Sequence, residues 1–245
     1  MRSSDGRVFR YPADTGVGWQ APTAPASHAN GNERKTMGRV VVSEFITLDG
    51  VVEDPGGSED FERGGWAFKF DRGADGDKFK LDEVMASDVL LLGRRTYEAF
   101  AEAWPSRTGD FADKFNQMPK YVVSGTLQDP EWNNTSVIER DIGAAVRRLK
   151  DDVGGDILVN GSVALVRTLV EEDLIDELRL MVYPTLLGAG KRLFAETREP
   201  TTLRPVASGR AGETVVLTYA WGATDAQDRG SRADQMKRAG IETAE

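Results

Sequence analysis

One stretch of this chain, residues 156–183, restricts the possible folds more than any other. It opens with the apolar run Ile157-Leu158-Val159, which is typical of a β-strand buried on both faces. The turn Asn160-Gly161-Ser162 follows, then a helical pattern over Val163 to Val170 and a second apolar strand from Leu180 to Tyr183. A strand, a helix and a strand in so short a span predict two parallel strands joined by a right-handed crossover.

The same alternation of apolar runs and helical patterns continues through most of the chain. Further strands are predicted over residues 40–46, 88–92, 120–124 and 137–139, and further helices over 77–86, 94–104, 111–118 and 142–149. Residues 203–207 and 214–221 alternate between apolar and polar side chains, which indicates an antiparallel hairpin. The sequence therefore predicts an α/β fold with a mainly parallel central sheet, helices on both faces and this hairpin at the edge.

The folded part of the chain is predicted to be a single domain over residues 38–221. Residues 1–37 are polar and rich in Gly and Pro, so we expect a disordered N-terminal extension there. Residues 222–245 are expected to form a polar C-terminal tail. Within the domain, residues 51–76 show no periodic pattern, and irregular segments of this length in compact domains are usually functional loops.

The counts of cysteine and histidine restrict the chemistry. The chain has no Cys and a single His, His28, which lies in the predicted extension. The absence of Cys excludes disulfides, a thiolate nucleophile and a Cys-ligated zinc site. One His outside the predicted domain argues against a His-based triad and against a multi-histidine metal site. We therefore expect no metal site, and we expect carboxylates, hydroxyls or a bound cofactor to carry any chemistry.

Charge and hydropathy indicate the kind of partner. The formal net charge of −9 argues against nucleic acid or an anionic membrane as the partner. No apolar run approaches the roughly 18 residues that span a bilayer, and the first residues lack the apolar centre of a signal peptide. We expect a cytoplasmic protein that acts on a small molecule.

Three predicted strands end in small or hydroxyl-bearing residues, namely Gly93, Ser124 and Gly161. In open α/β sheets the ligand lies beyond the carboxyl ends of the strands, so these residues mark a candidate binding edge. Gly161 would let the backbone approach a ligand, and the free N–H groups at the start of the next helix would suit a phosphate. The alternative is an ordinary strand-to-helix turn in which Ser162 caps the helix.

Two further turns have a functional and a structural interpretation. The turn Gly93-Arg94-Arg95-Thr96 places two guanidinium groups and a hydroxyl at a helix start, which suits a terminal phosphate; alternatively, both arginines are solvated surface charge. Asp49-Gly50 lies at a pocket mouth or is simply a turn in which the carboxylate bonds its own backbone. Gly188-Ala189-Gly190-Lys191 lacks the remaining residues of a P-loop, and no G-x-G-x-x-G follows any predicted strand.

Taken together, motifs along the whole predicted domain resemble the dihydrofolate reductase-like family. They resemble in particular the C-terminal reductase domain of the bifunctional riboflavin-biosynthesis deaminase/reductase. The motifs, in chain order, are Thr47-Leu-Asp-Gly50, Leu90-Leu-Leu-Gly-Arg-Arg-Thr-Tyr-Glu98, Tyr121-Val-Val-Ser124, Asn160-Gly-Ser162 and Tyr183-Pro-Thr-Leu-Leu-Gly-Ala-Gly190. The resemblance implies an NADPH-dependent reductase with a dihydrofolate reductase-like fold, and it leaves a homodimer open as the assembly.

The resemblance also implies roles for individual residues. Binding of the adenosine-side phosphate is assigned to Gly93, Arg94, Arg95 and Thr96, and binding of the pyrophosphate to Asn160, Gly161 and Ser162. Ser124 is assigned to the 2′-phosphate, and Asp49 and Gly50 are assigned to the substrate. Asp49 is the candidate for orienting the substrate or relaying a proton. Gly125 stands where many relatives have a basic residue, which weakens the preference for NADPH over NADH.

Three functions remain open from the sequence. The first is a reductase of the 5-amino-6-(5-phosphoribosylamino)uracil type, and the second is a pterin or dihydrofolate reductase. The third is a non-catalytic nucleotide-binding protein of the same fold. Any of several carboxylates between Glu59 and Asp82 could contact the substrate.

Overall fold

The computed structural model describes residues 37–194 and 200–222, and the expectations for residues 1–36 and 223–245 lie outside this part of the chain. In chain order the elements are β1 (Arg39–Thr47), the 3-10 helix η1 (Trp66–Lys69), α1 (Gly73–Ala86), β2 (Ser87–Gly93), α2 (Arg94–Ala103), α3 (Asp110–Gln117), β3 (Lys120–Val123), β4 (Thr135–Ile138), α4 (Ile142–Asp152), β5 (Asp156–Asn160), α5 (Val163–Glu171), β6 (Glu177–Tyr183), β7 (Arg204–Ala211) and β8 (Thr214–Ala220). No helix within the described residues is long and apolar enough to cross a membrane.

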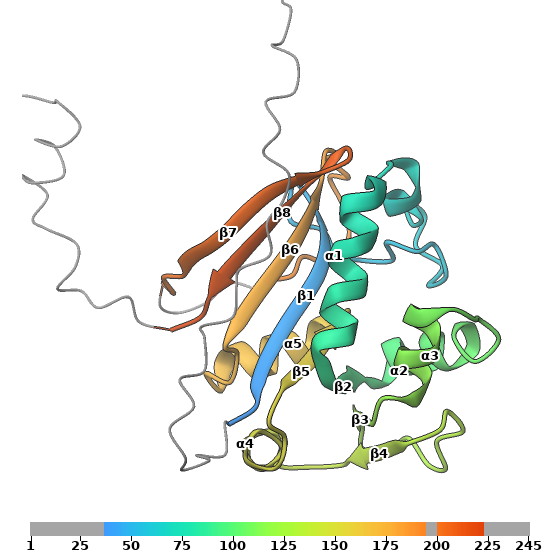
Figure 1. Cartoon of the computed structure of the whole chain (residues 1–245), viewed down its shortest axis with the longest axis vertical. Coiled ribbons are helices and arrows are strands. Elements are labelled where there is room, and N and C mark those ends of the chain that lie inside the picture. Colours follow the sequence, from blue (N-terminus) through green and yellow to red (C-terminus); the bar gives the residue numbers. More distant parts are fainter. Residues whose placement is uncertain (1–36, 195–199, 223–245) are drawn as a thin grey trace, which may run out of the picture.

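All eight strands form one sheet in the order β4-β3-β2-β5-β1-β6-β8-β7 (Figure 1). The first six strands in this order are parallel to their neighbours, and β8 and β7 are antiparallel. The predicted α/β sheet with an antiparallel C-terminal hairpin is therefore confirmed. β5 and β6 are parallel, as predicted, but β1 lies between them and pairs with both.

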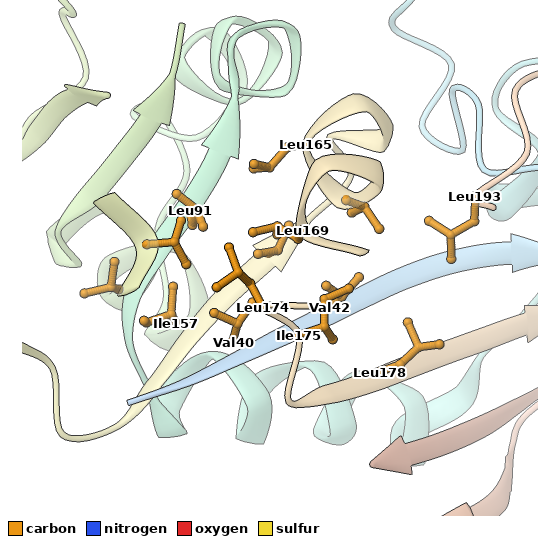
Figure 2. Close-up of a cluster of buried hydrophobic side chains, with 14 of the residues drawn as sticks. Val40, Val42, Leu91, Ile157, Leu165, Leu169, Leu174, Ile175, Leu178 and Leu193 are labelled. Atoms are coloured by element: carbon orange, nitrogen blue, oxygen red, sulfur yellow. The ribbon is translucent and has the colours of Figure 1, made fainter. Parts of the chain in front are cut away.

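Apolar side chains fill both faces of the sheet because the central strands alternate their side chains between two helical layers. On one face, Val40 and Val42 of β1 pack with residues of α4 and α5, such as Val146 and Leu169 (Figure 2). On the other face, Val41 packs with side chains from α1, α2 and α3. Both layers contribute to fixing β1 in the middle of the molecule.

Three elements begin or end where the apolar pattern alone did not place them. α1 begins at Gly73 rather than at residue 77, and Asp71 accepts the Gly73 N–H at 2.7 Å at this helix start. β6 begins at Glu177 rather than at residue 180 because residues 177–179 pair with β1 on one side and with β8 on the other. β7 runs on to Ala211 as an edge strand whose side chains are mostly exposed or half-buried.

The segment 51–76, predicted to be irregular, is organised around the buried residue Asp54. Its side chain accepts the Ser58 N–H at 2.7 Å, and its carbonyl accepts the N–H groups of Gly57 at 3.2 Å and Gly65 at 2.9 Å. Gly64 packs so closely that an added Cβ would lie 2.2 Å from an Asp54 carboxylate oxygen. Residues 51–65 thus form an ordered loop, and the rest of the segment is not irregular, because it contains η1 and the first residues of α1.

Candidate active site

Every residue in the predicted strand-end set lies at the same edge of the sheet. β3, β2, β5 and β1 are consecutive in the sheet and parallel, so their carboxyl ends point the same way. Ser124 follows β3, Gly93 ends β2, Asn160 ends β5, and Asp49 lies two residues past the end of β1. The shared edge predicted from these strand ends is therefore present.

The turns after β2 and β5 are linked directly to each other. The Gly93 N–H donates to the Ser162 hydroxyl at 2.8 Å, and the Ser162 N–H donates to the Thr96 hydroxyl at 3.0 Å. Gly161 and Ser162 both have a left-handed backbone, with φ of 60° and 63°. Ser162 occupies the N-cap position of α5, yet its side chain makes no capping hydrogen bond to that helix. Its hydroxyl holds the neighbouring turn instead.

This link changes the interpretation of the turn at residues 160–162, which was predicted to bind a phosphate. The Ser162 N–H is engaged by Thr96, and the Gly161 N–H is directed at the carboxyl group of Glu44. The Ser162 amide is therefore bonded within the protein, and the Gly161 amide faces a protein carboxyl group rather than open space. A contact between this turn and a phosphate remains a prediction, and it would have to use the amides that follow Ser162.

The two arginines of the β2 turn have different surroundings. Arg94 pairs with Glu98 one helical turn later at 2.8 Å on the surface. Arg95 makes no ion pair with another residue in the described part of the chain. It lines a hollow of about 350 Å³, together with Ser58, Glu59, Glu98, Ala99, Glu102 and Lys191. Arg95 is therefore the guanidinium group better placed to meet an anionic ligand.

Ser124 and Asp49 are both engaged by backbone amides. The Ser124 hydroxyl accepts the N–H groups of Thr126 at 3.1 Å and Leu127 at 2.9 Å, which fixes the turn after β3. Asp49 accepts the Leu187 N–H at 3.2 Å and the Gly188 N–H at 2.7 Å. Both residues therefore shape the loops at the binding edge, and any ligand contact would use their remaining hydrogen-bonding capacity.

The electrostatics of Asp49 bear on its predicted proton-relay role. The Thr47 hydroxyl donates to its carboxylate at 2.6 Å, and this bond, with the two amides, lowers the pKa of Asp49 below its usual value. A carboxyl group with a lowered pKa is ionised at neutral pH and has no proton to give. Gly50, next to it, has φ of 83°, and its carbonyl accepts the Leu193 N–H at 3.1 Å.

Nothing in the sequence indicated that Glu53 pairs with Lys191 and so joins the loop after β1 to the loop after β6. Glu53 accepts hydrogen bonds from both the backbone N–H and the side chain of Lys191. Val51 and Arg192 form an isolated antiparallel bridge beside it. Lys191, the last residue of the run rejected as a P-loop, thus begins the short segment 191–193 that pairs with residues 50–53. Burial raises the pKa of the neighbouring Glu59.

A second hollow of about 380 Å³ lies beside α1 and was also not identified. Its lining residues are Arg72, Asp77, Lys80, Leu81, Asp110 and Phe111. Lys80 is buried; its ammonium group donates to Ser43 at 3.0 Å and Asn160 at 3.3 Å and pairs with Glu83. A lysine in a helix is usually an exposed residue, and the one available signal was the polar Ser43 inside a buried strand.

The sequence and the structure of this chain are similar to those of known proteins. A family model described as the RibD C-terminal domain matches residues 39–217. The protein YwjB of Bacillus subtilis (strain 168) is 32% identical over 187 residues, which cover 76% of this chain and 98% of that protein. Two solved structures share the fold.

Acinetobacter baumannii RibD has a TM-score of 0.55 at 16% identity, with 76% of this chain and 59% of that chain covered. A pyrimidine reductase-like protein from Corynebacterium diphtheriae has a TM-score of 0.53 at 11% identity, with 76% and 93% covered. This chain therefore spans about three fifths of the length of the Acinetobacter baumannii RibD chain.

Proposed function

This chain belongs to the RibD C-terminal domain family, and on that premise we propose that it is an NADPH-dependent reductase. The proposed reaction is hydride transfer to a small heterocycle, of the 5-amino-6-(5-phosphoribosylamino)uracil reductase type. The observation that carries the proposal is the pair of linked turns after β2 and β5, which places Arg95 and the start of α5 at one edge of the sheet. This is the edge at which α/β sheets bind their ligands.

The residues at this edge fit a pyridine dinucleotide. Arg95 lines a hollow together with Lys191 and three glutamates, and it makes no ion pair with another described residue. Among the described residues, the side-chain N–H2 of Asn160 is buried without a hydrogen-bond partner at the end of β5. An orphaned buried donor at the end of a strand indicates a missing partner, because buried polar groups are nearly always bonded. Arg95 and Asn160 would therefore hold the dinucleotide.

The bound cofactor would supply the hydride, and the chain's own residues bind and orient the reactants. The hollow beside α1 offers Phe111 as an apolar surface for a ring, and its Arg72 pairs with Asp77 of the same hollow at 2.6 Å. Lys80 also lines this hollow, and its ammonium group donates to Ser43 and Asn160. It therefore links the proposed substrate site to Asn160 of the proposed cofactor site. We assign Asp49 to orienting the loop 184–190 and the substrate, since its lowered pKa leaves it ionised.

The binding half of the proposal is tested with two single variants. Arg95→Ala should weaken NADPH binding by about tenfold, as expected for loss of a charge-assisted contact of about 1.4 kcal/mol. Arg94→Ala is the matched control, because Arg94 already pairs with Glu98, and its effect should be at most about threefold. Equal effects of the two variants would contradict the assignment of Arg95.

The catalytic half is tested by the oxidation of NADPH, followed at 340 nm. We expect consumption with the ribosylaminopyrimidine and little with dihydrofolate. Consumption with dihydrofolate alone would make the protein a pterin reductase. Tight NADPH binding with no consumption by either substrate would support a nucleotide-binding protein without turnover.

A further inference from the structure

The strands β1 and β5 stop pairing before the carboxyl edge of the sheet, and we call the region beyond their last pair the opening. Pairing of these strands ends at Ser43 and Asn160, whereas β1 continues beside β6 as far as Thr47. Glu44 is the first residue of β1 beyond the last β5 pair. It is only 5% exposed, and it pairs in register with Leu180 of β6 on its other side. A carboxyl group thus lies buried at the wall of this opening.

The carboxyl group of Glu44 is incompletely bonded. Its Oε1 atom is buried and has no hydrogen-bond partner among the described residues, while the Gly161 N–H is directed at the group. Asn160, whose side chain points to the other face of the sheet and accepts from Lys80, also has an unpartnered buried atom, Nδ2. A buried polar atom left unpaired costs about 1–3 kcal/mol, so the unpartnered Oε1 atom of Glu44 indicates a ligand that is bound there in the working protein.

The surroundings of Glu44 favour its neutral form. On its own face of the sheet its neighbours by strand alternation are apolar, and they include Val42, Ile46 and Leu180. Burial raises the pKa of Glu44 well above its usual value. Of the charged residues on α1, Lys80 opposes this rise and Glu83 adds to it. The titratable residues of α5 are Arg167 and Glu171; one terminal nitrogen of Arg167 donates to the Arg192 carbonyl at 2.9 Å, and its Nε is buried without a partner among the described residues.

A neutral carboxyl group has one carbonyl oxygen and one hydroxyl group. If the carbonyl oxygen accepts the Gly161 N–H, the unpartnered Oε1 carries the proton and requires an acceptor. The opening lies on the side of β5 away from Arg95, because β2 and β1 flank β5 on opposite sides. A dinucleotide with its adenosine phosphates at Arg95 would therefore bring its nicotinamide-ribose half to Glu44.

We propose that Glu44 is a further cofactor-binding residue, which donates a hydrogen bond to an oxygen atom in the nicotinamide-ribose half of the dinucleotide. This inference rests on the proposed function. It predicts that binding takes place to the neutral carboxyl group, so affinity for NADPH falls as the pH rises through the pKa of Glu44. Above that pH the carboxylate loses its donor and repels the phosphates.

The test compares Glu44→Leu and Glu44→Gln with wild-type protein by calorimetry from pH 6 to pH 9.5. Two probes are used: NADPH and adenosine 2′,5′-bisphosphate, which lacks the nicotinamide-ribose half. Glu44→Leu should lose about tenfold or more in NADPH affinity, the loss expected for one buried hydrogen bond, and keep its affinity for the bisphosphate. Glu44→Gln retains an N–H donor, so it should bind NADPH within about threefold of wild type at low pH and lose the pH dependence.

Thermal unfolding shows that each variant is folded, and Glu44→Leu should have a higher Tm because it removes an unpaired buried polar group. Glu171→Gln, an exposed change on α5, controls for the loss of one negative charge. The inference is overturned if folded Glu44→Leu binds NADPH as wild type does, or if Glu44→Gln keeps the wild-type pH dependence. Wild-type protein that binds neither NADPH nor NADH would overturn the proposed function as well, so the two failures are distinguishable.

Discussion

At the scale of single residues, the turn after β5 shows how one glycine can serve the protein itself. Gly161 has φ of 60°, and an added Cβ would lie 3.1 Å from the Thr96 hydroxyl oxygen and 3.2 Å from its methyl group. The space beside Gly161 is therefore filled by Thr96. The sequence had suggested instead that this space allows the backbone to approach a ligand.

Gly161→Ala is accordingly expected to destabilise the fold first. The left-handed backbone costs about 1 kcal/mol in alanine, and the contact with Thr96 adds to it, so we expect a loss of about 1–2 kcal/mol. Urea unfolding measures this loss. Gly50→Ala is the matched control, because Gly50 has φ of 83° with nothing within 4 Å of an added Cβ. Equal losses in the two variants would show that the contact with Thr96 costs nothing.

Motif residues could be predicted to share one edge because strand polarity fixes that edge. Their hydrogen-bond partners could not be predicted, since partners depend on distances across the chain. Ser162 was considered as a cap for its own helix, yet its hydroxyl accepts from Gly93, 69 residues away in sequence. Glu44 was part of a short apolar run and gave no signal of its own. Its burial follows only from the central position of β1.

At the scale of elements, β3 contains a lysine that is fully buried in the sheet. The Lys120 ammonium group donates to the carbonyls of Asn116 at 2.7 Å, Met118 at 2.8 Å and Asn133 at 3.2 Å. It lies 4.3 Å from the centre of the Trp132 ring. Lys120 therefore joins α3, β3 and the loop before β4, and burial lowers its pKa to about 8.

The lowered pKa of Lys120 predicts how stability depends on pH. Between the folded pKa of about 8 and an unfolded pKa of about 10.4, the unfolded chain holds the proton and the folded chain does not. The free energy of unfolding should therefore rise with pH across this window, by about 1–3 kcal/mol. Denaturant unfolding of wild type and Lys120→Met at each pH isolates the effect. Parallel curves for the two proteins would show that the carbonyls keep Lys120 charged.

The type and order of the elements followed from apolar periodicity, whereas their ends did not. Glu177 and Arg179 are polar residues inside β6, and only their partners on β1, β5 and α1 explain why a strand accepts them. The order of strands in the sheet was likewise not readable from the sequence. Nothing local in β1 indicates that β5 and β6, rather than β2, are its neighbours.

At the scale of the whole molecule, an ionic network on the α1 face connects strands that are distant in sequence. Arg179 of β6 contacts Glu177 at 2.6 Å, Asp156 of β5 at 3.5 Å and Glu83 of α1 at 3.5 Å. Arg39 of β1 adds a further bond to Asp156 at 2.7 Å. Removing one partner from such a network leaves buried charges uncompensated.

Arg179→Met should therefore destabilise the protein by about 3 kcal/mol or more. Arg147→Met is the matched control, because Arg147 pairs with Glu172 at 3.1 Å where both side chains are exposed. That change should cost less than about 1 kcal/mol. Both values come from denaturant unfolding at low and high salt, and salt should alter the Arg179 effect little because the pair is buried. Similar losses in the two variants would contradict the role of the network.

The position of β1 between β5 and β6 has a consequence for the nascent chain during translation. Arg39 bonds to Asp156, which lies 117 residues later, so β1 leaves the ribosome long before either of its strand neighbours exists. At about 5–20 residues per second, that wait lasts roughly 6–23 s. During this time the run Val40-Val41-Val42, completely buried in the finished sheet, has no strand to pair with. If translation stalls before β5 is made, the nascent chain therefore exposes an apolar, unpaired strand. Chaperones bind segments of this kind.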